Sequence, residues 1–154
     1  MDNNIPFYTI TETVETEYNS CDEAISRTIE KYLGNKLHCL NGPAIQTYDP
    51  RDGRKIREVY YEHGNCHRDD GRPADITFFD DGNLLREEYF VNGKRHNENG
   101  VAIVSYNRDG SINAQRYYLN DELLTHEEWL LKTSSCDGKI VEIDGKQYRL
   151  TEVK

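Results

Sequence analysis

A tandem repeat with a period of 29 residues constrains the fold of this chain more than any other feature. Four histidines mark the repeat, at successive intervals of 29, 29 and 30 residues: His38, His67, His96 and His126. Glycines at positions 42, 71 and 100 keep the same step. Self-similarity at such a period indicates a repeat architecture, in which each unit packs on its neighbours.

Each unit also contains an Asp-Gly pair between two short β-prone runs. The pairs end at Gly53, Gly82 and Gly110, and glycine there supplies the positive φ that a tight hairpin turn needs. The predicted hairpins join residues 44–48 with 56–61, 74–79 with 85–90, and 102–106 with 113–119. We therefore interpret these glycines and the three histidines His38, His67 and His96 as structural residues of the repeat.

A second reversal is predicted at the end of each unit, at residues 63–64, 92–93 and 120–121. It returns the chain toward the next histidine, so each unit holds two long strands and a short third one. The fold class that follows is mostly β, a meander of tandem hairpin repeats forming an elongated sheet. The repeat region spans residues 34–126, with units at about 34–63, 64–92 and 93–121.

The flanking segments are predicted to cap the open ends of the sheet. Within residues 1–33, residues 6–18 are expected to form a strand, and the capping-box pattern at 20–23 is expected to open a helix that ends at Gly34. Within residues 127–154, we expect a short helix that begins at a second capping box from Thr125, followed by a hairpin over 138–150.

The charge of the chain favours a basic protein as its partner. The net charge is -9, divided as -5 over residues 1–33, -5 over 34–129 and +1 over the remainder. Nucleic acids and anionic membranes both require a surplus of Lys and Arg, so neither is expected to bind. The polar start and the absence of a long apolar run predict a cytoplasmic protein, in which the four cysteines are reduced thiols.

The segments 67–74 and 89–96 resemble a known repeat, "Tyr-x-Asn-Gly-Lys-x-His-Arg-x-Asp-Gly-Pro-Ala". Units of this type occur in short proteins of bacteria, bacteriophages and large DNA viruses, and are described as variants of the MORN repeat. The chain departs from the pattern at Arg72, Val101 and Asp121. The resemblance covers about 95 residues, and it implies β-hairpin repeats and a binding role rather than a specific activity. The phage or viral setting implies interference with a host protein.

Metal and catalytic interpretations of the histidines and cysteines are weakly supported. His38-Cys39 and Cys66-His67 contain two nitrogen and two sulfur ligands of the kind zinc takes, but equivalent residues of adjacent units are separated by roughly 10–14 Å in a sheet. A cysteine next to a histidine on a strand points to the opposite face, which disfavours a Cys-His nucleophile. We therefore expect no enzyme, no metal and no cofactor, and a histidine ring that bonds a backbone carbonyl or the following Asp.

The aromatic and arginine residues of the long strands are the predicted binding surface, together with the acidic segment before the array. The residues chosen from the strands are Tyr60, Tyr89, Tyr117, Arg57, Arg86 and Arg116. Exposed aromatics are efficient anchors for a partner, although the same rings can also simply pack the ladder. The arginines are expected to pair with Glu58, Glu87 or Glu88.

Three functions are compatible with these features. The leading hypothesis is a non-enzymatic protein-binding module that binds or inhibits a host protein through an acidic, Tyr-rich sheet surface. The first alternative is sequestration of a nucleotide-like ligand between aromatic and arginine side chains. The second is a metal-assisted hydrolase that uses His67, Asp69 or Asp70. Open sheet edges also make a homodimer a reasonable expectation.

Overall fold

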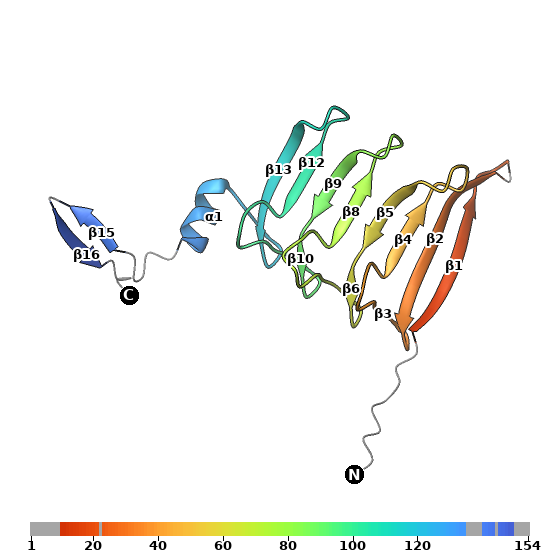
Figure 1. The fold of residues 1–154 in the computed structure, drawn as a ribbon, viewed down its shortest axis with the longest axis horizontal. Helices are drawn as coiled ribbons and strands as arrows, with labels where there is room; N and C mark the ends of the chain where they lie inside the picture. Colours follow the sequence, from red (N-terminus) through yellow and green to blue (C-terminus); the bar gives the residue numbers. More distant parts are fainter. Residues whose placement is uncertain (1–9, 22, 135–139, 144, 150–154) are drawn as a thin grey trace, which may run out of the picture.

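The fold is built on one large antiparallel meander sheet, accompanied by short two-stranded hairpins, which confirms the predicted fold class (Figure 1). The computed structural model describes residues 10–21, 23–134, 140–143 and 145–149. In sheet order, the strands are β1 (Ile10–Tyr18), β2 (Ala24–Leu33), β4 (Ile45–Tyr48), β5 (Lys55–Val59), β8 (Asp75–Phe78), β9 (Leu84–Glu88), β12 (Ile103–Tyr106), β13 (Ile112–Leu119) and β14 (Glu122–Leu124). β3 (Lys36–Leu37) pairs with the end of β2.

The three predicted repeat hairpins are present, as β4–β5, β8–β9 and β12–β13. In the middle one, the Gly82 N–H donates to the Phe79 carbonyl and the Phe79 N–H donates to the Asn83 carbonyl. The Asp81 carboxylate accepts the N–H of Asn83, and the equivalent bond recurs in both other hairpins. The Asp-Gly pairs thus close their turns through a positive φ and an Asp side chain.

Shorter hairpins follow the first two units. β6 (Tyr61–Glu62) pairs with β7 (Asn65–Cys66), and β10 (Phe90–Val91) pairs with β11 (Lys94–Arg95). Their two-residue turns have positive φ at both positions, as does the turn between β13 and β14. This geometry matches the twist of the flanking strands and confirms the predicted second reversals.

The predicted N-terminal helix is wrong, because residues 24–33 form β2. Its apolar residues fit a helical period, but several are β-branched or aromatic, and nine residue pairs join the strand to β1. The turn between the strands is organised by Asn19, whose carboxamide oxygen accepts the N–H groups of Cys21 and Glu23. Local side-chain bonding of this kind competes with helix capping. Residues 6–9 of the predicted first strand lie outside the described residues.

The C-terminal elements match their predictions. Helix α1 (His126–Thr133) begins after Thr125, whose hydroxyl accepts the Glu128 N–H while the Glu128 carboxylate accepts the Thr125 N–H. The last hairpin consists of β15 (Ile140–Ile143) and β16 (Lys146–Arg149). The remaining residues of the predicted 138–150 hairpin lie outside the described part of the chain. Of the described residues, no helix is long and apolar enough to cross a membrane.

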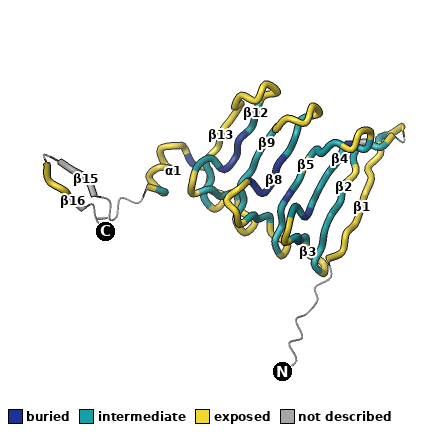
Figure 2. Tube along the Cα trace, viewed as in Figure 1, coloured by how far each residue is buried: buried dark blue, intermediate teal, exposed yellow. Residues whose placement is uncertain are grey.

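The buried core is a narrow line across the ends of the repeat strands that lie away from the Asp-Gly turns (Figure 2). One alanine in each repeat is fully buried, at Ala44, Ala74 and Ala102. Val59 is the largest side chain that is fully buried among the described residues. Because the sheet is a single layer, its apolar groups are covered by neighbouring strands and loops rather than by a facing sheet.

Replacing Gly82 with Ala isolates the cost of the left-handed turn conformation. A Cβ at Gly82 would meet no atom within 4 Å, but φ is +86°. We expect the substitution to lower the free energy of unfolding by about 1–2 kcal/mol, measured by urea denaturation. Gly100→Ala is the control, since its Cβ also meets nothing within 4 Å and no left-handed φ applies. A Gly82→Ala protein as stable as the wild type would contradict this assignment.

Candidate functional site

The predicted tyrosines and arginines lie on opposite faces of the sheet. Arg57 and Tyr60 are three residues apart, as are Arg86 and Tyr89, and successive strand residues alternate between faces. The same alternation separates the adjacent residues 116 and 117 of β13. The structure therefore does not bring the six residues together as one contact surface.

Tyr60 and Tyr89 are half-buried rings that pack within the fold. The guanidinium carbon of Arg68 lies 3.9 Å from the centre of the Tyr60 ring, so one face of that ring is already covered. Burial raises the pKa of both tyrosines above the ordinary value. One face of the Tyr60 ring is therefore occupied by Arg68, and both rings are only partly available to a partner.

Tyr117 packs against the C-terminal helix. Its ring centre lies 4.9 Å from that of His126 and 5.3 Å from that of Trp129. The indole N–H of Trp129 donates to the Asn97 carbonyl at 2.9 Å. His126, the fourth marker of the repeat, thus belongs to an aromatic cluster that holds α1 against the last unit.

The arginines of the other face form ion pairs along the array. Arg57 donates to Asp75 at 2.9 and 2.5 Å, which replaces the predicted pair with a glutamate. Arg86 lies 2.9 Å from Glu88, and the same carboxylate accepts from Arg95 at 3.0 Å. Arg57, Asp75, Glu88 and Arg95 line a groove of about 500 Å³ together with Tyr61 and Phe90. Its cations and anions are matched, so it offers little net charge to a ligand. Arg116 is exposed and forms no ion pair with any described residue.

Each repeat histidine bonds to the turn that ends its own unit. The ring Nδ1 atoms accept backbone N–H groups in three bonds: His38 from His63 at 3.2 Å, His67 from Asn92 at 3.1 Å, and His96 from Asn120 at 3.2 Å. Each donor has a positive φ. The partner of Nδ1 is a backbone N–H rather than the predicted carbonyl, whereas the other predicted partner, the following Asp, is present at Nε2 of His67. The ring joins the start of a unit to its last turn.

This bond decides how His67 relates to a possible metal site. Ligand atoms of Glu62, His67 and Asp69 lie within 4.8 Å of one another, in a groove of about 480 Å³ between the first two units. Because Nδ1 accepts the Asn92 N–H, the neutral ring carries its proton on Nε2, which donates to Asp69 at 2.5 Å. A metal ligand needs the opposite tautomer, with a lone pair at Nε2 and a proton on Nδ1. The cluster therefore favours hydrogen bonding over metal binding.

Asp70 and Cys66 are also unsuited to the chemistry considered from the sequence. The Arg72 guanidinium holds the pKa of Asp70 down at about 2, and Arg68 contacts the same carboxylate. Burial raises the pKa of the Cys66 thiol to about 12. A nucleophile must be a thiolate, and this shift disfavours the thiolate of Cys66 at neutral pH.

We expect His67→Ala to lower the free energy of unfolding by about 1 kcal/mol, because the Asn92 N–H loses its acceptor. In a chain of this size the melting temperature falls by about 2–4 °C for that change. Glu62→Gln is the control, since it alters the same cluster without touching the bond to the turn. Equimolar Zn²⁺ is expected to leave the wild-type melting temperature unchanged, and a clear rise would contradict the assigned tautomer.

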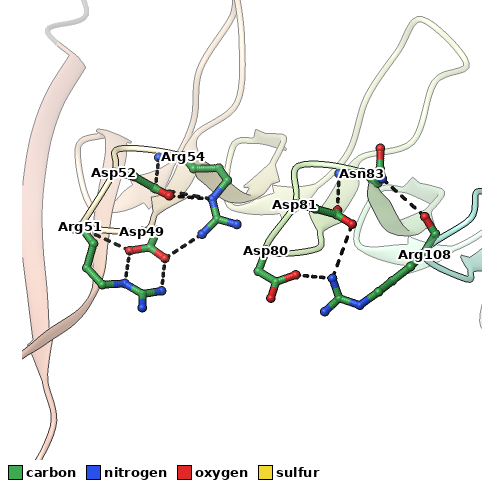
Figure 3. Close-up of polar contacts among 8 residues, drawn as sticks. All are labelled: Asp49, Arg51, Asp52, Arg54, Asp80, Asp81, Asn83 and Arg108. Atoms are coloured by element: carbon green, nitrogen blue, oxygen red, sulfur yellow. Dashed lines mark hydrogen bonds and ion pairs between the residues drawn. The ribbon is translucent and has the colours of Figure 1, made fainter.

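The Asp-Gly turns form a charged edge of the sheet (Figure 3). The buried Asp49 carboxylate accepts from Arg51 at 3.0 and 2.6 Å and from Arg54 at 2.9 Å. In the next unit, Asp80 pairs with Arg108 of the third unit. Hydrogen bonds from Arg51, supported by the charge of Arg54, hold the pKa of Asp49 well below its usual range.

The Asp49 contacts predict a loss of stability in acid. Because the pKa is lower in the folded state, the contribution is present above the unfolded value of about 4 and is lost as the pH falls below it. We expect Asp49→Asn to be less stable than the wild type at pH 7 and to lose less stability between pH 5 and pH 2. Urea denaturation across this range measures the effect, with Asp52→Asn as the control. Parallel pH profiles of Asp49→Asn and the wild type would contradict it.

Most basic residues of the array form ion pairs within the chain. Nine of the twelve Lys and Arg residues within 34–129 are paired: Arg51, Arg54, Lys55, Arg57, Arg68, Arg72, Arg86, Arg95 and Arg108. In contrast, Glu12, Glu15 and Glu17 of β1 form no ion pair with any described residue. Glu17 accepts only a hydroxyl, from Ser26 at 2.8 Å. β1 therefore carries three glutamates outside ion pairs, and two cations of β2, Lys31 and Arg27, lie opposite Glu12 and Thr16.

The predicted binding surface included the acidic segment that contains β1, but no individual residue of this strand was chosen. The position of β1 at the end of the sheet could not be predicted, because it depends on pairing with β2, which was predicted to be helical. Comparison with protein families, characterised proteins and solved structures finds no match for the chain. The similarity to MORN-variant repeats stays a prediction.

Proposed function

We propose that the chain is a non-enzymatic protein-binding module that associates with a basic surface of another protein. The observation that carries this proposal is the uneven use of charge. Nine of the twelve cations of the array are held in internal pairs, whereas the glutamates of β1 are exposed and form no ion pair with any described residue. Such a surface attracts a basic protein and increases its association rate.

The inferred partner is a protein of a host cell. This part of the proposal rests on the resemblance of the repeats to those of phage, bacterial and viral proteins. We further propose that the chain inhibits the bound protein, in the cytoplasm. The acid excess disfavours nucleic acid and anionic lipid as alternatives. The tautomer of His67 and the high pKa of Cys66 speak against the metal and thiol chemistry considered above.

Affinity capture at several salt concentrations tests the proposal. The immobilised chain is expected to retain a basic protein from bacterial lysate at about 0.1 M salt and to release it near 1 M, because the Debye length falls from about 10 Å to about 3 Å. Titration of the purified partner should show the same salt dependence. Recovery of no partner at low or physiological salt, or of one whose affinity is independent of salt, would overturn the proposed function.

A further inference from the structure

β1 ends the main sheet as a long, open edge strand (Figure 1). It pairs with β2 on one side, and no described strand pairs with its other side. All nine residues, Ile10–Tyr18, are exposed. An edge of this length presents a row of unpaired backbone groups to solvent.

The hydrogen-bond pattern identifies which backbone groups are open. The Lys31 N–H donates to the Ala44 carbonyl, so odd-numbered residues of β2 direct their backbone groups toward β4 and even-numbered residues direct theirs toward β1. Glu30 and Thr28 pair with Thr13 and Glu15. Thr13 and Glu15 therefore bond to β2.

The backbone groups of the alternate residues of β1 therefore face outward. The N–H and carbonyl groups of Glu12, Val14 and Thr16 point away from β2, at the spacing that an added strand requires. The strand offers a ready ladder of donors and acceptors.

The side chains of β1 define what an added strand should contain. Glu15 and Glu17 share one face with two threonines. The other face carries Ile10, Val14 and Tyr18, which are 40%, 49% and 62% exposed, together with Glu12 and Thr16. Opposite charges and apolar pairs across strands each contribute roughly 0.2–1 kcal/mol. A matching strand has Lys or Arg on the first face and apolar residues on the second.

β1 lacks two of the features by which proteins protect such edges, lysine and proline. Its register shift lies at its last residues, Glu17 and Tyr18. The charge of β1 disfavours a second copy of the same strand at this edge. A second copy of β1 would bring six glutamates together with no cation from either strand.

Resting on the proposed function, we propose that β1 is the docking edge, and that it takes an extended segment of the partner, alternating Lys or Arg with apolar residues, as an additional strand. Backbone hydrogen bonds supply the affinity in this mode of recognition, and alternate side chains supply the specificity.

Peptide titration separates strand addition from simple charge attraction. The probe is a labelled nine-residue peptide that alternates Lys with Val, and its binding is followed by fluorescence polarisation. Two comparison peptides keep the sequence with alternate amides N-methylated, or replace Lys with Glu. We expect the first peptide to bind and both comparison peptides to lose at least about tenfold in affinity, which is 1.4 kcal/mol. Equal binding of the N-methylated peptide would overturn the proposal.

Variants of β1 test the same point on the protein. Val14→Pro removes an outward N–H without removing a bond to β2. It should lower the affinity for the Lys-Val peptide at least about tenfold. Val14→Thr is the matched control, because it keeps the N–H and the branched side chain. Glu15→Gln with Glu17→Gln should weaken the peptide as well, whereas Glu122→Gln with Glu127→Gln removes the same charge elsewhere and should not.

Amide exchange of the wild-type protein gives a test that does not depend on whether a variant folds correctly. Peptide binding should slow amide exchange at Glu12, Val14 and Thr16 of the wild-type protein, and unchanged exchange at these amides would overturn the proposal. Sedimentation velocity detects the competing occupant. A wild-type dimer that Val14→Pro abolishes would assign the edge to a second copy and reject the basic segment.

Capture from lysate distinguishes failure of this inference from failure of the proposed function. Loss of the captured partner in Val14→Pro but not in Val14→Thr supports docking at β1. Equal capture by both variants leaves the proposed function standing and rejects β1 as its site. A wild-type chain that binds the peptide but captures no protein contradicts the proposed function and not the edge.

Discussion

The single-layer sheet is the constraint on which the rest of the structure depends. No sheet of the described residues faces it, so the array must gain cohesion from bonds that run along it, from one unit to the next. His67 illustrates this, since its backbone N–H donates to Tyr60 of the preceding unit and its ring accepts from Asn92 at the end of its own unit. The regular histidine spacing is therefore the sequence signature of a bonding pattern rather than of a ligand set.

The repeat hairpins were predictable because their signals are local. An Asp-Gly or Asn-Gly pair between β-prone runs determines a turn through its own φ angles and side-chain bonds, and Gly82 and Gly93 adopt the expected positive φ. The capping box at Thr125 is equally local. The prediction of a helix at residues 24–33 failed because their apolar spacing fits a helix and a strand alike. Pairing with β1, which is a contact between segments, decided the outcome.

The candidate site was less predictable than the fold. The separation of Tyr60 from Arg57 onto opposite faces follows from their odd spacing and was available from the sequence. The pairing of Arg57 with Asp75 could not be predicted from the sequence, because it depends on which strand lies beside β5. The open edge of β1 was hidden for the same reason. Knowing that a strand lies at an edge requires the order of every strand in the sheet.

The two ends of the sheet are treated differently, and this asymmetry bears on function. At the far end, β14 continues from the last long strand, and α1 is held there by Trp129 and by a pair between Lys132 and Glu122. At the near end, the chain adds a long hairpin, β1–β2, whose outer strand is acidic and uncovered. A chain that only needed to terminate its sheet could have used a short or lysine-bearing strand there. The length and charge of β1 are instead the properties of an edge kept accessible to a basic strand.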